Sequence, residues 1–174
     1  MEKKKRQILF SDEEICRKVR ELGAKITSDY KDGHLMVISL LKGSFIFAAD
    51  LVRRIELPVR VEFITTSMYG SSTENSGELK IQDSTPQDLS DYDVLVVDDI
   101  TDTALTMTGV LEYLRAKSPK SLKACVLLDK PSRRKVEYTA DYIGFEIPDM
   151  FIVGYGLNYG DHFRNEKNIF AFLD

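Results

Sequence analysis

Val94-Leu-Val-Val-Asp-Asp-Ile-Thr-Asp-Thr-Ala-Leu-Thr106 is the most informative stretch of this sequence. It opens with a continuous apolar run, which is typical of a strand buried on both faces in a parallel sheet. Two carboxylates, Asp98 and Asp99, follow directly, and we expect the strand to end there. A helical pattern then covers residues 105–116. The stretch therefore predicts a strand, an acidic loop and a helix in succession.

The loop between this strand and this helix carries groups that suit a phosphorylated sugar. A helix N-terminus offers free backbone N–H groups and the positive end of the helix dipole to a phosphate. The hydroxyls of Thr103 and Thr106 add hydrogen-bond donors. The carboxylates of Asp98, Asp99 and Asp102 suit vicinal ribose hydroxyls or a hydrated Mg²⁺. An acidic loop that only faces solvent is the ordinary alternative, and the neighbouring threonines favour the binding site.

Composition fits one soluble domain over residues 1–174, because a chain of 174 residues can bury one sizeable core. No apolar run approaches the roughly 20 residues that a membrane span needs. We expect the basic residues 1–9 to form a solvated tail, since no apolar secretory stretch follows them. A net charge of −4 argues against general nucleic-acid binding. Cys16 and Cys125, the only cysteines, are expected to be reduced thiols in a cytoplasmic protein.

Strands alternate with helices along the chain, which predicts an α/β fold with a doubly wound, mainly parallel sheet. Ser11 and Glu14 form a capping box that begins the first helix, and a second helix is expected over residues 45–55. The polar, glycine-bounded residues 70–77 are expected in an exposed mobile loop that spans residues 68–80. The expected strands cover residues 35–41, 59–67, 78–82, 94–98, 122–128, 142–147 and 151–154.

Three motifs in this order resemble the hypoxanthine-guanine phosphoribosyltransferases, which are type I phosphoribosyltransferases of purine salvage. The acidic stretch resembles their phosphoribosyl-pyrophosphate motif. The other two are Leu40-Leu-Lys-Gly-Ser-Phe-Ile-Phe-Ala-Ala-Asp-Leu51 and Gly144-Phe-Glu-Ile-Pro-Asp-Met-Phe-Ile-Val-Gly-Tyr-Gly-Leu157. The resemblance runs from about Phe10 to the C-terminus. It implies the fold of that family, with a small hood beside the sheet. It also implies transfer of the phosphoribosyl group of phosphoribosyl pyrophosphate to hypoxanthine or guanine, giving IMP or GMP and pyrophosphate, with Mg²⁺.

The resemblance implies a role for each residue of the acidic stretch. Asp98 and Asp99 would hold the ribose hydroxyls and contribute to the metal site. Asp102 would act as general base on the incoming purine, and enclosure by ligand would raise its proton affinity through desolvation. The 5′-phosphate would be cradled by Thr103, Ala104, Leu105 and Thr106. The family usually has Gly at position 104. If φ is positive there, Ala104 costs about 1 kcal/mol or more of strain; steric interference with the phosphate and plain tolerance are the alternatives.

The resemblance also implies contacts to pyrophosphate and to the purine. Pyrophosphate would be bound by Lys42, Gly43, Met68, Tyr69 and Arg164, with a cis peptide bond before the lysine. The loop over residues 68–80 would close over the reacting centre and exclude water. On the purine, Lys130 would donate to the 6-oxo group, Phe151 would stack on the ring and the Ile152 backbone would meet the base edge. The ordinary interpretations are a strand-end turn for Lys42 and Gly43, an exposed lysine for Lys130, and core packing for Phe151 and Ile152.

Four positions depart from the family pattern and keep a second interpretation open. Met68 replaces the Ser of a Ser-Tyr pair, Asp98 replaces Glu, and Ala104 replaces Gly. Asn158 replaces an Asp that helps to hold a second Mg²⁺ through water, so the metal site would be weaker. These changes suit a low-activity paralogue or a nucleotide-sensing regulator that keeps the phosphoribosyl-pyrophosphate site, and Val-Asp-Asp also resembles pyrimidine-operon attenuators, which bind RNA. The acidic charge and the purine-side residues favour the enzyme. The family also implies a homodimer or homotetramer.

Overall fold

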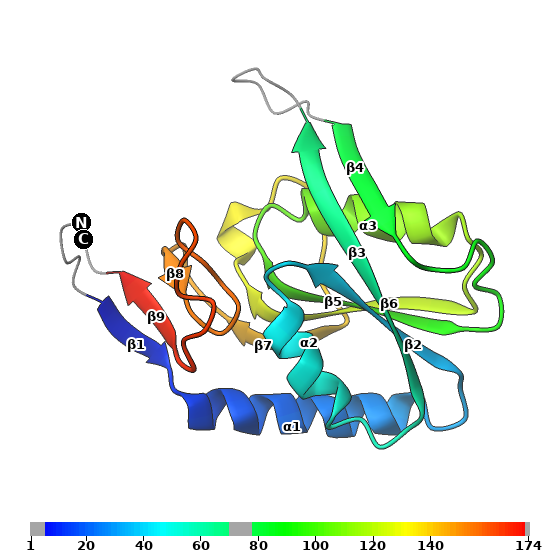
Figure 1. The fold of residues 1–174 in the computed structure, drawn as a ribbon, viewed down its shortest axis with the longest axis horizontal. Helices are drawn as coiled ribbons and strands as arrows, with labels where there is room; N and C mark the ends of the chain where they lie inside the picture. The colour runs from blue at the N-terminus through cyan, green and yellow to red at the C-terminus, as the bar shows by residue number, and fades with distance from the viewer. Residues whose placement is uncertain (1–5, 70–77, 173–174) are drawn as a thin grey trace.

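A six-stranded sheet forms the core of the computed structural model, which describes residues 6–69 and 78–172 (Figure 1). The strand order is β4-β3-β2-β5-β6-β7, and only β4 runs antiparallel to its neighbour. The strands are β2 (Leu35–Leu41), β3 (Val59–Tyr69), β4 (Glu78–Asp83), β5 (Asp93–Thr101), β6 (Ser121–Asp129) and β7 (Tyr142–Glu146). The predicted mainly parallel sheet is therefore confirmed.

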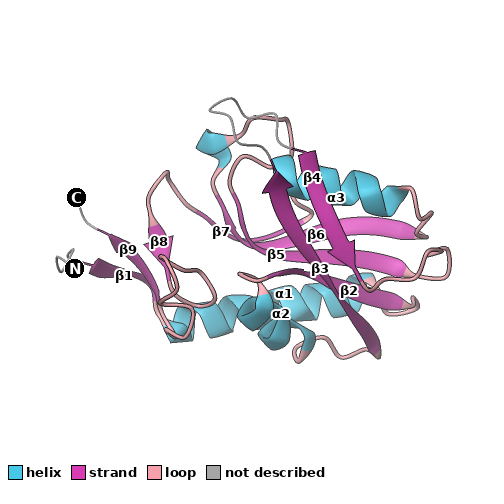
Figure 2. Cartoon of the chain, turned by 45° about the horizontal axis from the view of Figure 1, so that its top comes forward, coloured by secondary structure: helices cyan, strands magenta, loops and turns pink. Residues whose placement is uncertain are grey.

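Helices cover both faces of this sheet (Figure 2). Helices α1 (Asp12–Asp29) and α2 (Phe45–Val52) pack on one face and α3 (Leu105–Arg115) on the other, while η1 (Pro131–Arg133) is a single 3₁₀ turn. Strand β5 is apolar on both sides because Leu95 and Val97 face α1 and α2, while Val94 and Val96 face α3. The predicted capping box of α1 is present. None of the helices in the described ranges is long and apolar enough to cross a membrane.

A second, three-stranded sheet forms the hood, in the order β1-β9-β8. Its strands are β1 (Arg6–Phe10), β8 (Ile152–Val153) and β9 (Ile169–Phe172). The hood is anchored on the core because the Phe10 ring stacks on Phe145, with 4.0 Å between the ring centroids. The expected tail is therefore wrong for residues 6–9, which belong to β1. Residues 1–5 lie outside the described part of the chain.

Several element boundaries differ from those expected. Strand β5 does not end at the first carboxylate but continues to Thr101, because it stays paired with β6 up to Thr101 and Asp129. Helix α2 ends at Val52, and residues 53–55 lie outside it, the first two of them in a turn. The expected loop over residues 68–80 is wrong at both ends, because residues 68–69 belong to β3 and residues 78–80 to β4. Residues 70–77, including the loop expected to be mobile, lie outside the described residues.

Strands β2 and β5 part at their carboxyl ends, and this separation positions the site. Their pairing ends at Ser39 and Val97, whereas β2 stays paired with β3 up to Leu41. The chain leaves β2 toward α2 on one face and leaves β5 toward α3 on the other. Open α/β sheets bind ligands at such a topological switch point. The loop after β2 and the acidic stretch therefore flank the expected ligand site.

Candidate active site

Asp98 and Asp99 occupy successive positions near the end of β5, so their side chains start toward opposite faces of the sheet. Asp98 lines a pocket on the α3 side, and its Oδ1 accepts the backbone N–H of Asp99 at 3.0 Å. The carboxylate of Asp99 lies against the Cα of Gly43, where a Cβ would overlap it. The acidic stretch and the loop after β2 are thus in direct contact through Asp99 and Gly43.

The local environment disfavours the ionised form of both carboxyl groups. Burial raises the pKa of Asp98 well above its ordinary value, and the adjacent charge of Asp99 adds to the shift. Burial also raises the pKa of Asp99, although hydrogen bonds and the Arg164 guanidinium oppose this. A group that donates to both carboxylates, or a cation between them, would therefore be stabilised here.

The carboxylates fit Mg²⁺, which prefers hard oxygen ligands. Across residues 6–69 and 78–172, no group of three or more His, Cys, Asp or Glu side chains is arranged as a metal site. Mg²⁺ commonly takes one or two carboxylates and completes its shell with substrate phosphates and water, so two acidic oxygens meet that requirement. Asn158 is exposed in the hood, and its Nδ2 donates to the Gly160 carbonyl oxygen at 2.5 Å. Its amide oxygen is the group that it can offer to a metal.

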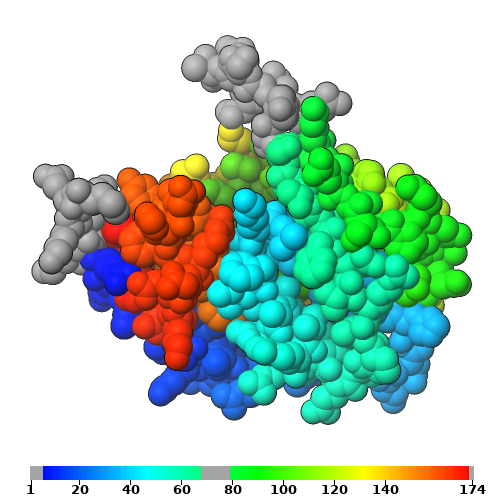
Figure 3. All heavy atoms as spheres, in the orientation of Figure 1, coloured from blue at the N-terminus to red at the C-terminus, as the bar shows by residue number. Residues whose placement is uncertain are grey.

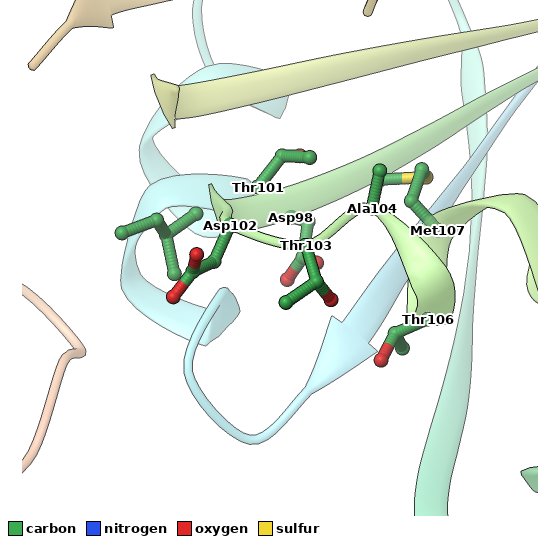
Figure 4. Close-up of a pocket in the computed structure, with 8 residues that line it drawn as sticks. Asp98, Thr101, Asp102, Thr103, Ala104, Thr106 and Met107 are labelled. Atoms are coloured by element: carbon green, nitrogen blue, oxygen red, sulfur yellow. The ribbon is translucent and has the colours of Figure 1, made fainter. Parts of the chain in front are cut away.

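A pocket of about 140 Å³ lies between the end of β5 and the start of α3. Its lining consists of Asp98, Ile100, Thr101, Asp102, Thr103, Ala104, Thr106 and Met107. The side-chain oxygen atoms of Asp98, Asp102, Thr103 and Thr106 lie on one side of the loop (Figure 4). The first N–H groups of a helix have no intrahelical partner, and Ala104 at the N-cap supplies no capping side chain. The pocket thus combines hydroxyls with backbone donors, as a phosphate site requires.

Ala104 has a left-handed backbone conformation, with φ 67° and ψ 0°. Its side chain is buried in the pocket wall. The expectation that a positive φ would make this alanine a strained replacement for Gly therefore has a geometric basis.

We expect Ala104→Gly to raise the free energy of unfolding by about 0.5–1 kcal/mol, because relief of left-handed strain exceeds the added chain entropy of Gly. Urea unfolding measures this change. The matched control is Ala116→Gly, because Ala116 is the C-cap residue after α3 and has an ordinary right-handed φ of −65°. That control should lower the free energy of unfolding by roughly 1 kcal/mol. Equal destabilisation by both substitutions would contradict the strain at position 104.

Residues expected on the purine side meet around the turn after β6. Lys130 is buried, and its Nζ donates to the Met150 carbonyl oxygen at 2.7 Å, so the ordinary interpretation as an exposed lysine is wrong. The Asp102 carboxylate is 38% exposed and accepts from Arg133 Nε at 2.9 Å. Phe151 is 51% exposed, which excludes simple core packing for this ring, whereas Ile152 is buried.

The structure brings three of the residues expected at pyrophosphate to one place. The peptide bond between Leu41 and Lys42 is cis, as the resemblance implied. Gly156 packs so closely on the Gly43 carbonyl oxygen that a Cβ there would overlap it. Arg164 Nη1 donates to the Gly156 carbonyl oxygen at 2.5 Å, so Arg164 is joined to the hood glycine that packs on this loop. Lys42 is exposed at the same loop.

Two other residues expected at pyrophosphate, Met68 and Tyr69, lie at the end of β3. Their backbone is placed by pairing with Leu79 and Glu78 of β4. Their side chains are not among the described atoms, so their expected contacts stay predictions.

Sequence reasoning missed three residues at this site. Arg134 donates to the carbonyl oxygens of Thr101 at 3.1 Å and Asp102 at 2.7 Å, and it thereby fixes the backbone of the acidic loop. Arg133 holds the Asp102 side chain. Tyr159 packs edge-on against the Phe151 ring, with 5.4 Å between centroids. The one signal in the sequence was the pair of arginines shortly after Lys130. A charged pair of this kind is equally typical of a solvent-exposed turn, so it did not indicate a role in the site.

Comparison with known proteins agrees with this geometry. Residues 6–160 match a family described as the phosphoribosyl transferase domain. A hypoxanthine-guanine phosphoribosyltransferase from Aquifex aeolicus is 47% identical, covering 98% of this chain and 97% of the relative. One from Bacillus subtilis is 45% identical, covering 91% and 88%. The crystal structure of a hypoxanthine phosphoribosyltransferase from Staphylococcus aureus superposes with a TM-score of 0.90 at 37% identity, covering 96% and 91%.

Proposed function

The chain belongs to the phosphoribosyl transferase family as an enzyme of purine salvage, and we propose that it transfers the phosphoribosyl group of phosphoribosyl pyrophosphate to hypoxanthine or guanine. The products would be IMP or GMP and pyrophosphate. The observation that carries this proposal is the high identity to hypoxanthine-guanine enzymes over nearly the whole chain. The meeting of the acidic loop, the loop after β2 and the hood at one switch point supports it.

The proposed ligand orientation follows from the four parts of the site. The 5′-phosphate would occupy the pocket at the start of α3, where Thr103 and Thr106 present hydroxyls. The ribose hydroxyls would donate to the carboxylates at the end of β5, which relieves their desolvation. Pyrophosphate would lie at the loop after β2, and the purine would lie between Lys130 and the exposed ring of Phe151. Figure 3 shows the orange part of the hood lying next to α2, in cyan.

In the proposed mechanism Asp102 takes the proton of the purine ring nitrogen as that nitrogen bonds to the anomeric carbon of the ribose. The bond from this carbon to pyrophosphate breaks through an oxocarbenium-like transition state. Arg134 donates to the backbone carbonyl oxygen of Asp102, so the Asp102 carboxylate is positioned before substrate binds. The cation Lys130 lies under the hood, where it can polarise the 6-oxo group.

We propose that Mg²⁺ is required and that Asp98, Asp99 and, more weakly, Asn158 would hold it. The bound ion would offset the negative charge that develops on the departing pyrophosphate. An amide at position 158 provides a neutral oxygen where a carboxylate would add a full charge.

Asn158→Asp is expected to lower the Mg²⁺ concentration that gives half-maximal rate by several-fold, because a charged oxygen binds this hard cation more strongly. Mg²⁺ titration of the initial rate measures the shift. Asn165→Asp is the matched control, since Asn165 is an exposed amide of the same hood segment and the change in net charge is identical. The same response from both variants would assign the effect to net charge rather than to position 158.

An assay of the purified protein tests the proposed function directly. It would supply phosphoribosyl pyrophosphate and Mg²⁺ with hypoxanthine, guanine, xanthine, adenine or uracil in separate reactions. Nucleotide formation from the 6-oxopurines alone is the expected result, and its rates rank the substrates. Binding of IMP and GMP without any product would instead indicate the low-activity paralogue or nucleotide-sensing regulator.

We propose further that the enzyme is a cytoplasmic homodimer or homotetramer that binds no nucleic acid. Phe45, Val61 and Phe63 are 44%, 38% and 46% exposed on the α2 side of the sheet, and exposed apolar side chains gathered on one face suit a subunit interface. Figure 3 shows α2 and β3 adjoining on this face. Cys16 and Cys125 are free thiols, which suits a reducing compartment. Sedimentation velocity decides between monomer, dimer and tetramer.

A further inference from the structure

We propose that Arg133 is a positioning residue for catalysis, which aligns the general base Asp102 with the hood segment that carries the purine-stacking ring of Phe151. This inference rests on the proposed function. The Asp102 carboxylate would contact the edge of the purine, and the Phe151 ring would stack on its face. These two groups belong to different parts of the fold, and both must be positioned for the same ligand.

Arg133 connects these parts through one guanidinium group. Its Nε donates to Oδ1 of Asp102 at 2.9 Å, and its Nη1 donates to Oδ2 of Asp149 at 3.2 Å. Asp102 follows β5 of the core sheet, whereas Asp149 lies just before β8 of the hood. Because a guanidinium is planar and rigid, contact with both carboxylates restricts the distance between them.

The turn that carries Arg133 is itself well anchored. Arg133 ends η1, and its backbone N–H donates to the Lys130 carbonyl oxygen at 3.1 Å. The Lys130 N–H in turn donates to the Thr101 carbonyl oxygen at 2.9 Å, next to the base. Pro131 begins the turn with a restricted φ. The guanidinium therefore extends from a fixed backbone. Its two contacts fix the Asp102 and Asp149 carboxylates relative to that backbone.

The hood segment depends on this turn at consecutive residues. Asp149 accepts from Arg133, and the Met150 carbonyl oxygen accepts from Lys130 Nζ at 2.7 Å. Phe151 comes next, and its ring meets the edge of Tyr159. Two cations from one turn therefore hold the segment that leads into the stacking ring, one at the Asp149 side chain and one at the Met150 backbone. Loss of the Arg133 contact would leave this segment held by Lys130 and by the packing of the Phe151 ring on Tyr159 and Phe172.

Arg133 and its neighbour Arg134 have separate tasks. Arg134 is largely buried and holds the backbone carbonyl oxygens of Thr101 and Asp102. Arg133 is 47% exposed and holds the Asp102 side chain. An exposed ion pair contributes little to the stability of a fold. Replacement of Arg133 should therefore leave the protein folded, so that its effect on catalysis can be measured.

The experiment compares three substitutions in the full chain by steady-state kinetics and thermal unfolding. Arg133→Gln removes both contacts, and Arg133→Lys keeps the charge without the planar two-carboxylate contact. Asp149→Asn weakens the hood contact of Arg133 together with the 3.9 Å ion pair between Asp149 and Lys130, and it leaves the contact to Asp102 in place. The matched control is Arg53→Gln, because Arg53 is an exposed arginine paired with Asp50 on α2, away from the purine side. Each variant is assayed for kcat and for the KM values of the purine and of phosphoribosyl pyrophosphate.

For Arg133→Gln we expect kcat to fall about 10-fold and purine KM to rise, since small misplacement of a reacting group has effects of this size or larger. The KM of phosphoribosyl pyrophosphate should stay within about two-fold, because its proposed contacts do not involve this turn. Asp149→Asn should mainly raise purine KM. Arg133→Lys should recover part of the lost kcat through one carboxylate contact. The melting temperatures of these variants and of Arg53→Gln should resemble that of the unsubstituted protein.

The outcomes separate this inference from the function on which it rests. An active unsubstituted enzyme whose kcat and purine KM do not change in Arg133→Gln refutes the positioning role alone. So does a variant in which both KM values and the melting temperature change together, because that pattern indicates general loss of structure. An unsubstituted protein that makes no nucleotide from any 6-oxopurine refutes the proposed function, and the positioning role with it.

Discussion

Asp102→Asn lowers kcat by about 100-fold or more if Asp102 takes the purine proton, because general-base catalysis contributes effects of that size. The amide keeps an oxygen that can accept from Arg133 Nε, so the loop should retain its geometry. What it loses is the ability to hold a proton at that oxygen. The rate of IMP formation at saturating substrates, followed spectrophotometrically, measures the change.

Two further measurements make the Asp102 result interpretable. The thermal unfolding temperature of Asp102→Asn should match that of the unsubstituted protein, which excludes misfolding as the cause. Asp102→Glu keeps a carboxylate on a longer side chain and should retain more activity than the amide. A kcat close to normal in Asp102→Asn would move the role of base to another residue.

Gly43→Ala is expected to raise the KM for phosphoribosyl pyrophosphate about 10-fold or more, because overpacking at a tightly packed position costs roughly 1–3 kcal/mol. A Cβ at position 43 would overlap the carboxylate of Asp99, whose short side chain has little room to withdraw. Either the carboxylate or the loop after β2 must move, and both have proposed contacts to this substrate. Initial rates at varied phosphoribosyl pyrophosphate and saturating hypoxanthine give the KM.

The chain provides a matched control for this substitution at Gly33, which contacts the opposite end of β5. A Cβ on Gly33 would also overlap an aspartate carboxylate, that of Asp93, which begins β5. Gly33→Ala should therefore lower stability comparably while it leaves the KM unchanged. If both substitutions raise the KM equally, the effect comes from distortion of β5 as a whole and not from the site.

The core sheet could be predicted because its strands carry strong local patterns. Strand β5 is apolar on both faces and is followed by turn and helix signals within a few residues, so its place in a parallel sheet could be predicted. The hood could not be predicted in this way. Arg6 of β1 pairs with Phe172 of β9, and a local sequence pattern does not indicate a pairing partner so distant in the sequence. Its exposed first residues also resemble a solvated basic tail.

The sequence could predict that the candidate residues gather at one edge of the sheet, but not how they are arranged there. The switch-point rule brings the loop after β2 to the acidic loop, and the structure adds that Gly43 and Asp99 touch. The positive φ of Ala104 could be stated only as a condition, because alanine is common in ordinary helical and extended backbone. Arg133 and Arg134 gave no distinguishable signal, since the function of a surface arginine depends on which carboxylates the fold brings to it.

The hood joins strands from opposite ends of the described chain, and this has a consequence for biosynthesis. Strand β9 lies between β1 and β8, and Phe172 packs against the Phe151 ring, with 5.6 Å between centroids. Chains emerge from the ribosome in order, and the N-terminal parts fold first. The sheet that carries the pocket at the start of α3 can therefore assemble on a nascent chain while β1 still has no partner. The hood around Phe151 is completed only when β9 has been synthesised.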